Sequence, residues 1–504
     1  MPYTEKKQDF INKATETISD DPTTRLGPVA KRIVERNNFV FDAHCHIFDG
    51  DCVKVTYLVT RFLISFSEYL PPSIYWAVKK IFRRIFRLTS FELKSTDLFI
   101  NDLLPGGKSS FDLLSEAELQ EELNQSIESF IEEINTTAIK SEKQVDVDTF
   151  LNEFEREIDE LEKQLETSVE LYSEVHKAAL FGFDRRGFFR RLRHIIGLLR
   201  SKTMKTVLNR FEDGYAINQV YNKLFGTDKE QLSVVLGMDL NSGWNGTSEK
   251  SYAKQNKELG SLSKTEGILP YLPIDPRRSD DEGDENLYTA FLKAFNKENP
   301  NFFGIKCYPA LGYLPSDSRL SPIFEICEKK NIPVLTHCGG EMISTFKNPV
   351  IVYRGDKQEK IKDQKRQQRA RKLNEPSEWK PVLEQFNSLR LCLGHFGGKS
   401  AWNGNKATKN RIPTIIEMMT TYPNLYADFS FNLESEKTVQ AFTKKLFSDD
   451  STGELMRSRT LFGTDFWVVL PMSDLNADQK YFLKAVRNLK DQLLTTNVVK
   501  YLGI

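Results

Sequence analysis

Short apolar runs recur along the chain and are separated by segments long enough to form helices. These runs end near His46, Leu240, Asp275, Lys306, His337, His395, Ser430 and Asp465. Runs of this length are typical of buried strands, and segments such as residues 286–296 and 316–330 supply the helices between them. The alternation predicts an α/β fold, and eight strands favour a closed (β/α)8 TIM-like barrel over an open sheet.

One connection of the predicted barrel is much longer than the others. Residues 70–220, between the first and second strands, carry apolar residues at three- and four-residue steps over 119–134 and 154–165. This spacing is typical of amphipathic helices and favours an antiparallel helical hairpin. We therefore expect three parts: an N-terminal segment with the first strand (1–69), a helical insertion (70–220) and the remainder of the barrel (221–504).

The insertion concentrates charge that the whole chain balances. The 504 residues include 70 Lys and Arg and 70 Asp and Glu, so no global field favours nucleic acid or a membrane. Residues 112–175 nevertheless hold 20 acidic and 4 basic residues, and residues 177–210 hold 10 basic residues and one acidic. Solvated or mutually paired helix faces explain this pattern. That is the interpretation we favour. The alternative is a docking surface for another subunit, a macromolecule or an anionic membrane, and basic amphipathic stretches at 75–87 and 188–200 fit both interpretations.

Cysteine usage and hydropathy indicate a cytoplasmic protein. The six cysteines lack paired spacing, and three of them adjoin the ends of predicted strands, which favours reduced thiols. The first residues are polar and lack the apolar core of a signal peptide. The longest apolar candidate, residues 53–78, is interrupted by charged residues, so no membrane-spanning helix is expected.

Four of the six histidines follow a pattern that suits one metal site. His44 and His46 belong to a single apolar run, and because strand side chains alternate, both imidazoles point to the same face. Further runs end at His337, His395, Asp465 and Lys306. A parallel barrel builds its site at the carboxyl ends of its strands. The two remaining histidines, in charge-rich helical sequence, are interpreted as structural.

These residues resemble the signature of the amidohydrolase superfamily in order: His-x-His on the first strand, Lys on the fourth, His on the fifth and sixth, and Asp on the eighth. The segment at 391–398 is similar to the amidohydrolase-related, or type 2, branch. The Lys-Cys-Tyr-Pro-Ala segment at 306–310 looks like the lysine segment of dihydroorotases. The resemblance covers about residues 38–50 and 231–470. The arginine that dihydroorotases place after His-x-His is missing, which argues against that activity.

The resemblance implies a metal-dependent enzyme. It assigns one or two divalent ions, zinc above all, to His44, His46, Lys306, His337, His395 and Asp465. Neutral imidazoles and a carboxylate suit zinc. We expect hydrolysis of an amide, cyclic amide, lactone or related ester by metal-bound hydroxide, with Asp465 and His395 as catalytic residues. Lys306 is either carboxylated on its Nζ, as a bridge between two ions, or an ammonium that binds substrate beside one ion.

Alternatives remain open for the substrate and for the reaction. Tyr308, Trp402 and Trp467 are candidate substrate-binding residues near strand ends, although the tryptophans suit packing equally well. Residues 354–372 carry nine basic and three acidic residues and form either a lid that favours an anionic small molecule or a solvated helix. A single-metal decarboxylase of the type 2 branch is the rival enzyme. A non-enzymatic scaffold that uses the charged insertion is the rival outside catalysis.

Overall fold

We analysed a computed structural model of the chain. It describes residues 3–48, 52, 221, 230–244, 248, 250–340, 343–345, 347–363, 365–469, 473 and 475–504. The chain separates into two compact units, one formed by Met1–Cys52 with Asp213–Ile504 and the other by Val53–Glu212. The expected helical insertion over 70–220 and the apolar stretch at 53–78 lie outside the described residues. The boundaries at 70 and 220 therefore stay predictions.

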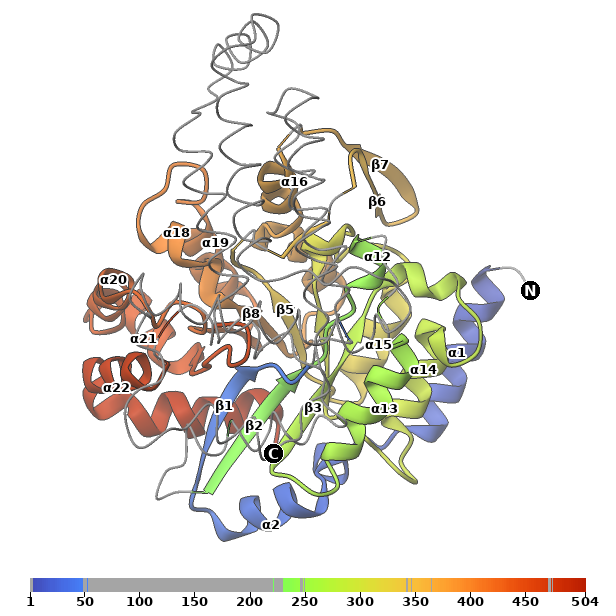
Figure 1. Ribbon diagram of the computed structural model, residues 1–504, viewed down its shortest axis with the longest axis horizontal. Coiled ribbons are helices and arrows are strands. Elements are labelled where there is room, and N and C mark those ends of the chain that lie inside the picture. The colour runs from blue at the N-terminus through green and yellow to red at the C-terminus, as the bar shows by residue number, and fades with distance from the viewer. Residues whose placement is uncertain are drawn as a thin grey trace, which may run out of the picture. The chain divides into compact units, whose positions relative to one another are not determined.

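Eight parallel strands form one sheet in the first unit (Figure 1). Their spatial order follows the chain, with each strand hydrogen-bonded to the next. The strands are β1 (Phe39–Cys45), β2 (Glu230–Leu236), β3 (Ile268–Ile274), β4 (Gly304–Cys307), β5 (Val334–His337), β8 (Leu391–Gly394), β9 (Leu425–Asp428) and β10 (Thr460–Leu461). All eight correspond to the predicted apolar runs, which confirms the TIM-like barrel.

The first strand closes the barrel against the segment that follows β10. Ala43 N–H donates to the Phe462 carbonyl at 2.9 Å, and His46 N–H donates to the Phe466 carbonyl at 3.1 Å. Between them, Asp465 N–H donates to the His44 carbonyl at 2.7 Å. Closure therefore brings a residue from the end of the chain beside the two histidines of the first strand.

Helices surround the sheet, as a parallel barrel requires (Figure 1). The predicted helices at 286–296 and 316–330 are present, each slightly shorter than expected. The helices are α1 (Tyr3–Thr17), α2 (Pro28–Arg36), α12 (Asn241–Trp244), α13 (Tyr252–Leu262), α14 (Leu287–Phe295), α15 (Ser321–Lys329), α16 (Arg366–Leu373), α17 (Lys380–Gln385), α18 (Lys399–Trp402), α19 (Arg411–Thr421), α20 (Glu436–Leu446), α21 (Ser451–Arg459), α22 (Leu475–Ala485) and α23 (Asn497–Leu502).

An apolar cluster fills the barrel near the amino-terminal ends of its strands. Phe41, Leu232 and Leu335 contribute to it from three strands, and α2 and α23 add further side chains. Tyr501 of α23 reaches across and donates from its hydroxyl to the Val334 carbonyl at 2.9 Å. Because this cluster supplies the stability of the barrel floor, the carboxyl ends of the strands are left for polar residues.

The basic segment at 354–372 is part of an ordered excursion after β5. Strands β6 (Val350–Arg354) and β7 (Lys357–Ile361) form an antiparallel hairpin, and α16 follows. Val350 and Leu373 pack against each other in a small apolar cluster, and Arg369 is buried. The segment is thus packed against its surroundings through β6 and α16, while Lys357, Gln358 and Lys360 of β7 are exposed.

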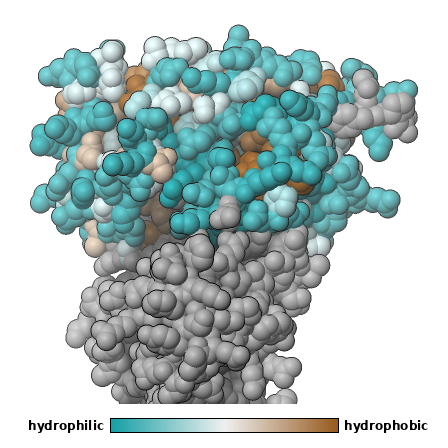
Figure 2. Space-filling model, turned by 90° about the horizontal axis from the view of Figure 1, so that it is seen from above, coloured by the Kyte–Doolittle hydropathy of each residue, from teal (hydrophilic) through white to brown (hydrophobic). Residues whose placement is uncertain are grey.

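On the face seen in Figure 2, the described part of the chain is mostly hydrophilic, with small apolar areas. Among the described large hydrophobic side chains, Ile351 on β6 stands out as exposed. None of the helices that the structure describes combines the length and the apolar character needed to span a membrane.

Candidate metal centre

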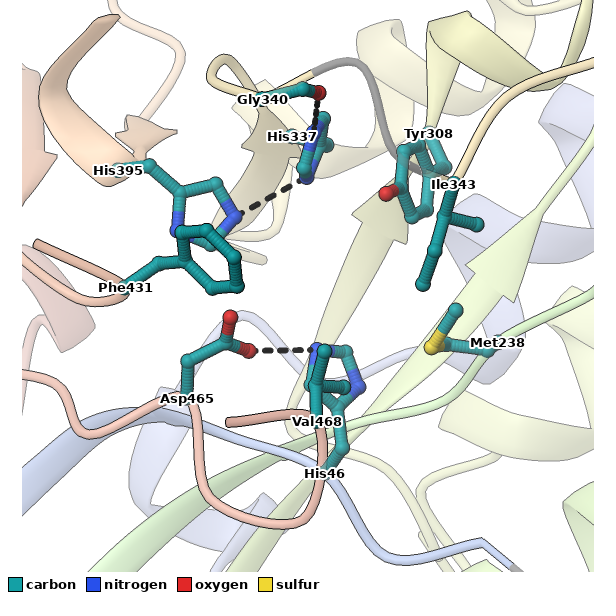
Figure 3. A pocket seen from close by; sticks show the side chains of 10 residues that line it. All are labelled: His46, Met238, Tyr308, His337, Gly340, Ile343, His395, Phe431, Asp465 and Val468. Carbon is teal, nitrogen blue, oxygen red and sulfur yellow. Dashed lines mark hydrogen bonds and ion pairs between the residues drawn. The ribbon is translucent and has the colours of Figure 1, made fainter. Parts of the chain in front are cut away.

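The carboxyl ends of the strands bring the predicted histidines together. His44 lies on β1 and His46 directly follows it, while His337 ends β5 and His395 directly follows β8. The ring centroid of His395 lies 4.6 Å from the centroids of both His44 and His337. All four side chains are buried. Figure 3 shows three of the rings and Asp465 around one cavity.

Asp465 completes a three-residue group with the His-x-His pair. Its Oδ1 lies 3.3 Å from His46 Nε2 and 3.5 Å from His44 Nε2. One ligand atom from each of these buried residues lies within 4.8 Å of the others. This spacing and this donor set suit a divalent cation.

Each of the four imidazole rings has an inner nitrogen that faces the cluster and an outer nitrogen that faces away from it, and the hydrogen bond of the outer nitrogen determines which of the two carries the proton. An oxygen acceptor lies 2.9 Å from the outer nitrogen of every ring, in the pairs His44 Nδ1 to Asp428 Oδ2, His46 Nδ1 to the Leu236 carbonyl, His337 Nε2 to the Gly340 carbonyl and His395 Nδ1 to Ser430 Oγ. Carbonyl and carboxylate oxygens accept only, so the outer nitrogens of His44, His46 and His337 carry the proton. The Ser430 hydroxyl donates to Asp428 and therefore accepts from His395 Nδ1. The inner nitrogen then presents a lone pair.

These lone pairs face one another, which calls for a cation between them. His337 Nδ1 lies 3.0 Å from His395 Nε2. In the described part of the chain, His44 Nε2, Asp465 Oδ1 and Lys306 Nζ are buried polar atoms with no hydrogen-bond partner. Leaving such groups unsatisfied is costly. The residues present therefore fit a bound divalent metal.

Burial also keeps the imidazoles in the form that binds metal. Desolvation lowers the pKa of His46 to about 3 and that of His395 to about 4. It holds the pKa values of His44 and His337 well below their usual range. Metal ligation requires neutral imidazole, so all four rings are ready to ligate at neutral pH.

The same burial perturbs two oppositely charged groups. Desolvation raises the pKa of Asp465 to about 7, against the lowering effect of His395 and Lys306. Desolvation lowers the pKa of Lys306 to about 8, although Asp428 and Asp465 raise it. Perturbed carboxyl and amine groups in one buried site are typical of catalytic centres.

Backbone strain gathers at the same strand ends. Positive φ angles occur at His395 (63°), Phe431 (60°), Asp465 (54°) and Trp467 (74°), all in the segments that follow β8, β9 or β10. Non-glycine residues rarely adopt this conformation, and it costs on the order of 1–3 kcal/mol at each site. The barrel thus holds these side chains in orientations that a relaxed loop would not select.

A cavity is lined by several of the candidate metal-binding residues (Figure 3). Its lining combines polar groups with apolar side chains, namely His46, Met238, Tyr308, His337, Gly340, Ile343, His395, Phe431, Asp465 and Val468. Tyr308 stacks on His337 with ring centroids 4.1 Å apart, in keeping with its predicted place at the site. A small substrate would enter against an apolar wall and meet the cluster on the opposite side.

The two predicted tryptophans do not line this cavity. Trp402 donates from Nε1 to the Phe396 carbonyl at 3.0 Å and packs against Phe429 and Phe442. Trp467 is fully buried, with its ring 5.6 Å from that of Phe466. Of the two interpretations left open by the sequence, packing is the one that these contacts support.

Comparison with known families agrees with this geometry. A family model described as amidohydrolase matches residues 273–503, which include β4 to β10 and four of the six predicted site residues. The match supports the amidohydrolase superfamily. Over these residues, which are less than half of the chain, the protein is similar to the amidohydrolase family. The dihydroorotase-like character of the lysine segment finds no support in the comparisons.

Solved structures with similar folds share little sequence with this amidohydrolase-like chain. An uncharacterised TIM-barrel protein from Bordetella bronchiseptica is 17% identical, with 57% of this chain and 83% of that chain covered and a TM-score of 0.39. 4-Oxalomesaconate hydratase from Rhodopseudomonas palustris is 13% identical, with 54% of this chain and 76% of that chain covered and a TM-score of 0.34. A zinc-bound amidohydrolase from Burkholderia multivorans is 10% identical, with 60% of this chain and 92% of that chain covered and a TM-score of 0.35. TM-scores this low carry no argument about activity. A search of curated proteins found no match.

Asp428 is the residue of this amidohydrolase-like site that sequence reasoning missed. It ends β9, is fully buried and hydrogen-bonds His44. A signal was available, because an apolar run ends at this carboxylate just as other runs end at the predicted ligands. The predicted strand was instead extended to Ser430, two residues further along the chain.

Gly463 has no side chain, and His44 packs in the space that a side chain there would fill. A Cβ atom at this glycine would lie 2.6 Å from His44 Cβ, which real structures essentially never show. The glycine of the Leu-Phe-Gly-Thr-Asp segment thus has a steric reason, since the chain must pass this closely for Asp465 to reach the histidines.

We expect Gly463→Ala to displace His44 and to weaken metal binding together with the fold. Overpacking of this kind costs typically about 1–3 kcal/mol of stability. Titration with zinc and thermal unfolding of the same sample measure both effects. A variant with wild-type metal affinity and an unchanged unfolding temperature would contradict the packing described here.

Proposed function

We propose that the protein is a metal-dependent hydrolase of an amide, cyclic amide, lactone or related ester. The observation that carries this proposal is the convergence of unprotonated nitrogens of His44 and His46 on the Asp465 carboxylate in a buried site. Hydrolysis of a carbonyl compound needs activated water beside a group that can take its proton. This site can provide both.

His44 Nε2, His46 Nε2 and Asp465 Oδ1 would hold one ion, for which zinc is our first choice. Three protein ligands leave a coordination position open, as catalytic sites require. Such an ion supplies activation of water at neutral pH, by lowering the pKa of a coordinated water from 15.7 to about 7. The side chains around it must then orient the substrate and move the proton.

Asp465 is placed to hold that proton. In the metal-free protein, burial raises the pKa of its carboxyl group to about 7, and a carboxylate beside activated water is a suitable general base. In our proposal it accepts the proton of the attacking water and returns it to the leaving nitrogen or oxygen. His395, which also lines the cavity, presents an unprotonated Nε2 and would be the second catalytic residue, able to accept a proton during turnover.

Lys306 would decide whether a second ion binds. Its buried Nζ has no hydrogen-bond partner among the described residues. In the neutral form, which a lowered pKa of about 8 favours, the amine can attack carbon dioxide. A nitrogen–carbon bond forms, an oxygen takes the electron pair of one C=O bond, and a proton leaves. The resulting carbamate would be an anionic group that, together with His337 and His395, could hold a second ion.

A single-metal decarboxylase is the second candidate, and one contact favours it. His337 Nδ1 and His395 Nε2 lie only 3.0 Å apart, and among the described residues neither group that could hold a metal contains both of them. If they share a proton rather than an ion, Lys306 remains an ammonium beside one metal. A cation next to the cavity would then suit a carboxylate substrate.

The cavity also describes the substrate we expect. Met238, Ile343 and Val468 form an apolar wall, and Tyr308 offers an aromatic face. A small molecule with one reactive carbonyl and an apolar body fits this lining. The charged insertion would affect assembly or targeting rather than this chemistry.

We expect Asp465→Asn to reduce turnover by about 10²- to 10⁴-fold, the usual contribution of a general acid or base. The measurement is hydrolysis of a panel of small lactones, cyclic amides and esters by zinc-loaded protein, with release of carbon dioxide from small carboxylic acids assayed in parallel. Asp449→Asn, at an exposed aspartate, is the matched control. Full turnover by zinc-loaded Asp465→Asn would sink the assignment, and carbon dioxide release without hydrolysis would select the decarboxylase.

A further inference from the structure

The buried carboxylate of Asp428 is hydrogen-bonded to the His44 ring directly and to the His395 ring through Ser430. Asp428 is completely buried at the end of β9. Its Oδ2 accepts from His44 Nδ1 at 2.9 Å and from Cys392 Sγ at 3.6 Å. Its Oδ1 accepts from the backbone N–H groups of His395 and Ser430, each at 3.1 Å, and from the Ser430 hydroxyl.

We propose that Asp428 is the positioning residue that sets the proton on both His44 and His395, and thereby the metal affinity of the centre. It would act from outside the cluster and touch no substrate. The inference rests on the proposed metal-dependent function, but the position of the ring protons can be measured without any metal.

For His44 the effect is direct. A carboxylate oxygen cannot donate, so the proton of the neutral ring must sit on Nδ1, which faces Asp428. The lone pair is then on Nε2, 3.5 Å from Asp465 Oδ1. Partners of this kind fix the tautomer of a ligating histidine and raise its basicity.

For His395 the effect passes through Ser430. The Ser430 hydroxyl donates its only proton to Asp428, so it must accept from His395 Nδ1 at 2.9 Å. The Ser430 carbonyl, 3.4 Å from the same nitrogen, likewise can only accept. His395 Nε2 is left with its lone pair toward His337. One carboxylate thus orients rings from two different strands.

Asp428 could instead be a metal ligand, since ligand atoms of His44, His395 and Asp428 also lie within 4.8 Å of one another. That reading would use His44 Nδ1, which already donates to the carboxylate. It would also displace hydrogen-bond donors from a carboxylate that accepts from five groups. The hydrogen-bonded arrangement therefore favours positioning over ligation.

Asparagine at position 428 should reverse the polarity at His44. Three donors surround Oδ1, so the amide oxygen will take that side. The amide NH₂ then faces His44 Nδ1 and can only donate, which moves the ring proton to Nε2. A protonated Nε2 cannot bind a metal.

Asp42 offers a matched control. It is also completely buried and accepts from the His44 backbone N–H at 3.1 Å, the Thr464 N–H at 3.0 Å and the Tyr221 hydroxyl at 2.9 Å. No hydrogen bond of the described structure joins its carboxylate to an imidazole ring. Asp42→Asn therefore reproduces the loss of a buried carboxylate without the proposed effect on a tautomer.

The test compares wild type, Asp428→Asn and Asp42→Asn of the full chain. Nitrogen-15 NMR of labelled histidines in metal-free protein gives the tautomers, and titration with Co²⁺ alone gives the affinity. We expect His44 to carry its proton on Nδ1 in wild type and on Nε2 in Asp428→Asn, with cobalt affinity reduced about 10- to 100-fold. Asp42→Asn should keep the wild-type tautomer and stay within about threefold in affinity, below that range.

A proton on His44 Nε2 in wild type would overturn the proposal, and this measurement needs no variant to fold. Unchanged tautomer or affinity in folded Asp428→Asn would overturn it as well. If wild type binds no cobalt, the proposed function fails, whereas the tautomers still decide the role of Asp428. If Asp428→Asn lost a spectroscopic signal of carboxylate bound to Co²⁺ while His44 kept its proton on Nδ1, Asp428 would be a metal ligand. That result would reject the positioning role.

Discussion

In His46→Ala, and equally in His44→Ala, the protein is expected to lose its bound metal and all metal-dependent turnover. Each imidazole supplies one of three ligand atoms that converge in the buried group with Asp465. Loss of one leaves the ion under-coordinated in a site that excludes most water. We expect affinity to fall by more than about 100-fold, beyond the range seen when an outer-shell partner is removed.

Elemental analysis of purified protein and thermal unfolding with added zinc measure this loss together. Wild type should be stabilised by about 2.7 kcal/mol when zinc is 100-fold above its dissociation constant, and the variants should show no such gain. His176→Ala, at a histidine outside the strand-end pattern, controls for histidine removal. Full metal occupancy in the His44→Ala, His46→Ala double variant would refute the site.

The second large effect is expected for Lys306→Ala, because that residue separates the two mechanisms. If Lys306 is a carboxylated bridge, the variant should bind one ion where wild type binds two. Short-chain carboxylates added with metal should then restore part of the turnover by replacing the lost anion. If Lys306 is an ammonium, metal content should stay normal, substrate affinity should fall and small amines should rescue.

Lys306→Met provides the matched control, since it keeps the length of the side chain and removes the amine. Metal stoichiometry, rescue and a carbamate signal after exposure to ¹³C-labelled carbon dioxide are the readouts. Normal metal content without carboxylate rescue would eliminate the bridged pair. Either outcome is informative, because Lys306 Nζ is buried and has no hydrogen-bond partner among the described residues.

Local pattern was enough for the barrel and for most of the cluster. Each strand is a short apolar run, and a residue that ends such a run lies at the same end of a parallel barrel as its counterparts. His337 at the end of β5 and Lys306 within β4 follow this rule directly. The order of the ligands along the chain therefore predicted their convergence before any contact was known.

Strand limits were less predictable, because hydrogen bonding to neighbours decides where a ladder stops. The second strand ends at Leu236 rather than near Leu240, and β10 contains only two residues before the chain turns away. Asp465 reaches the cluster through this turn, with a positive φ and a backbone bond to His44. An apolar pattern contains no signal for such a conformation.

The sequence by itself determined the α/β barrel, the set of convergent histidines with Asp465 and the unusual lysine, because these depend on periodicity and on order along the chain. Tertiary structure alone decided the positions of Asp428 and Trp402 and the hydrogen-bond partners of the imidazole rings. A tryptophan near a strand end can face either a cavity or a helix, and only packing against Phe429 and Phe442 decides for the second. Likewise, a histidine tautomer depends on which acceptor lies behind the ring, and for His44 that acceptor comes from a residue 384 positions away.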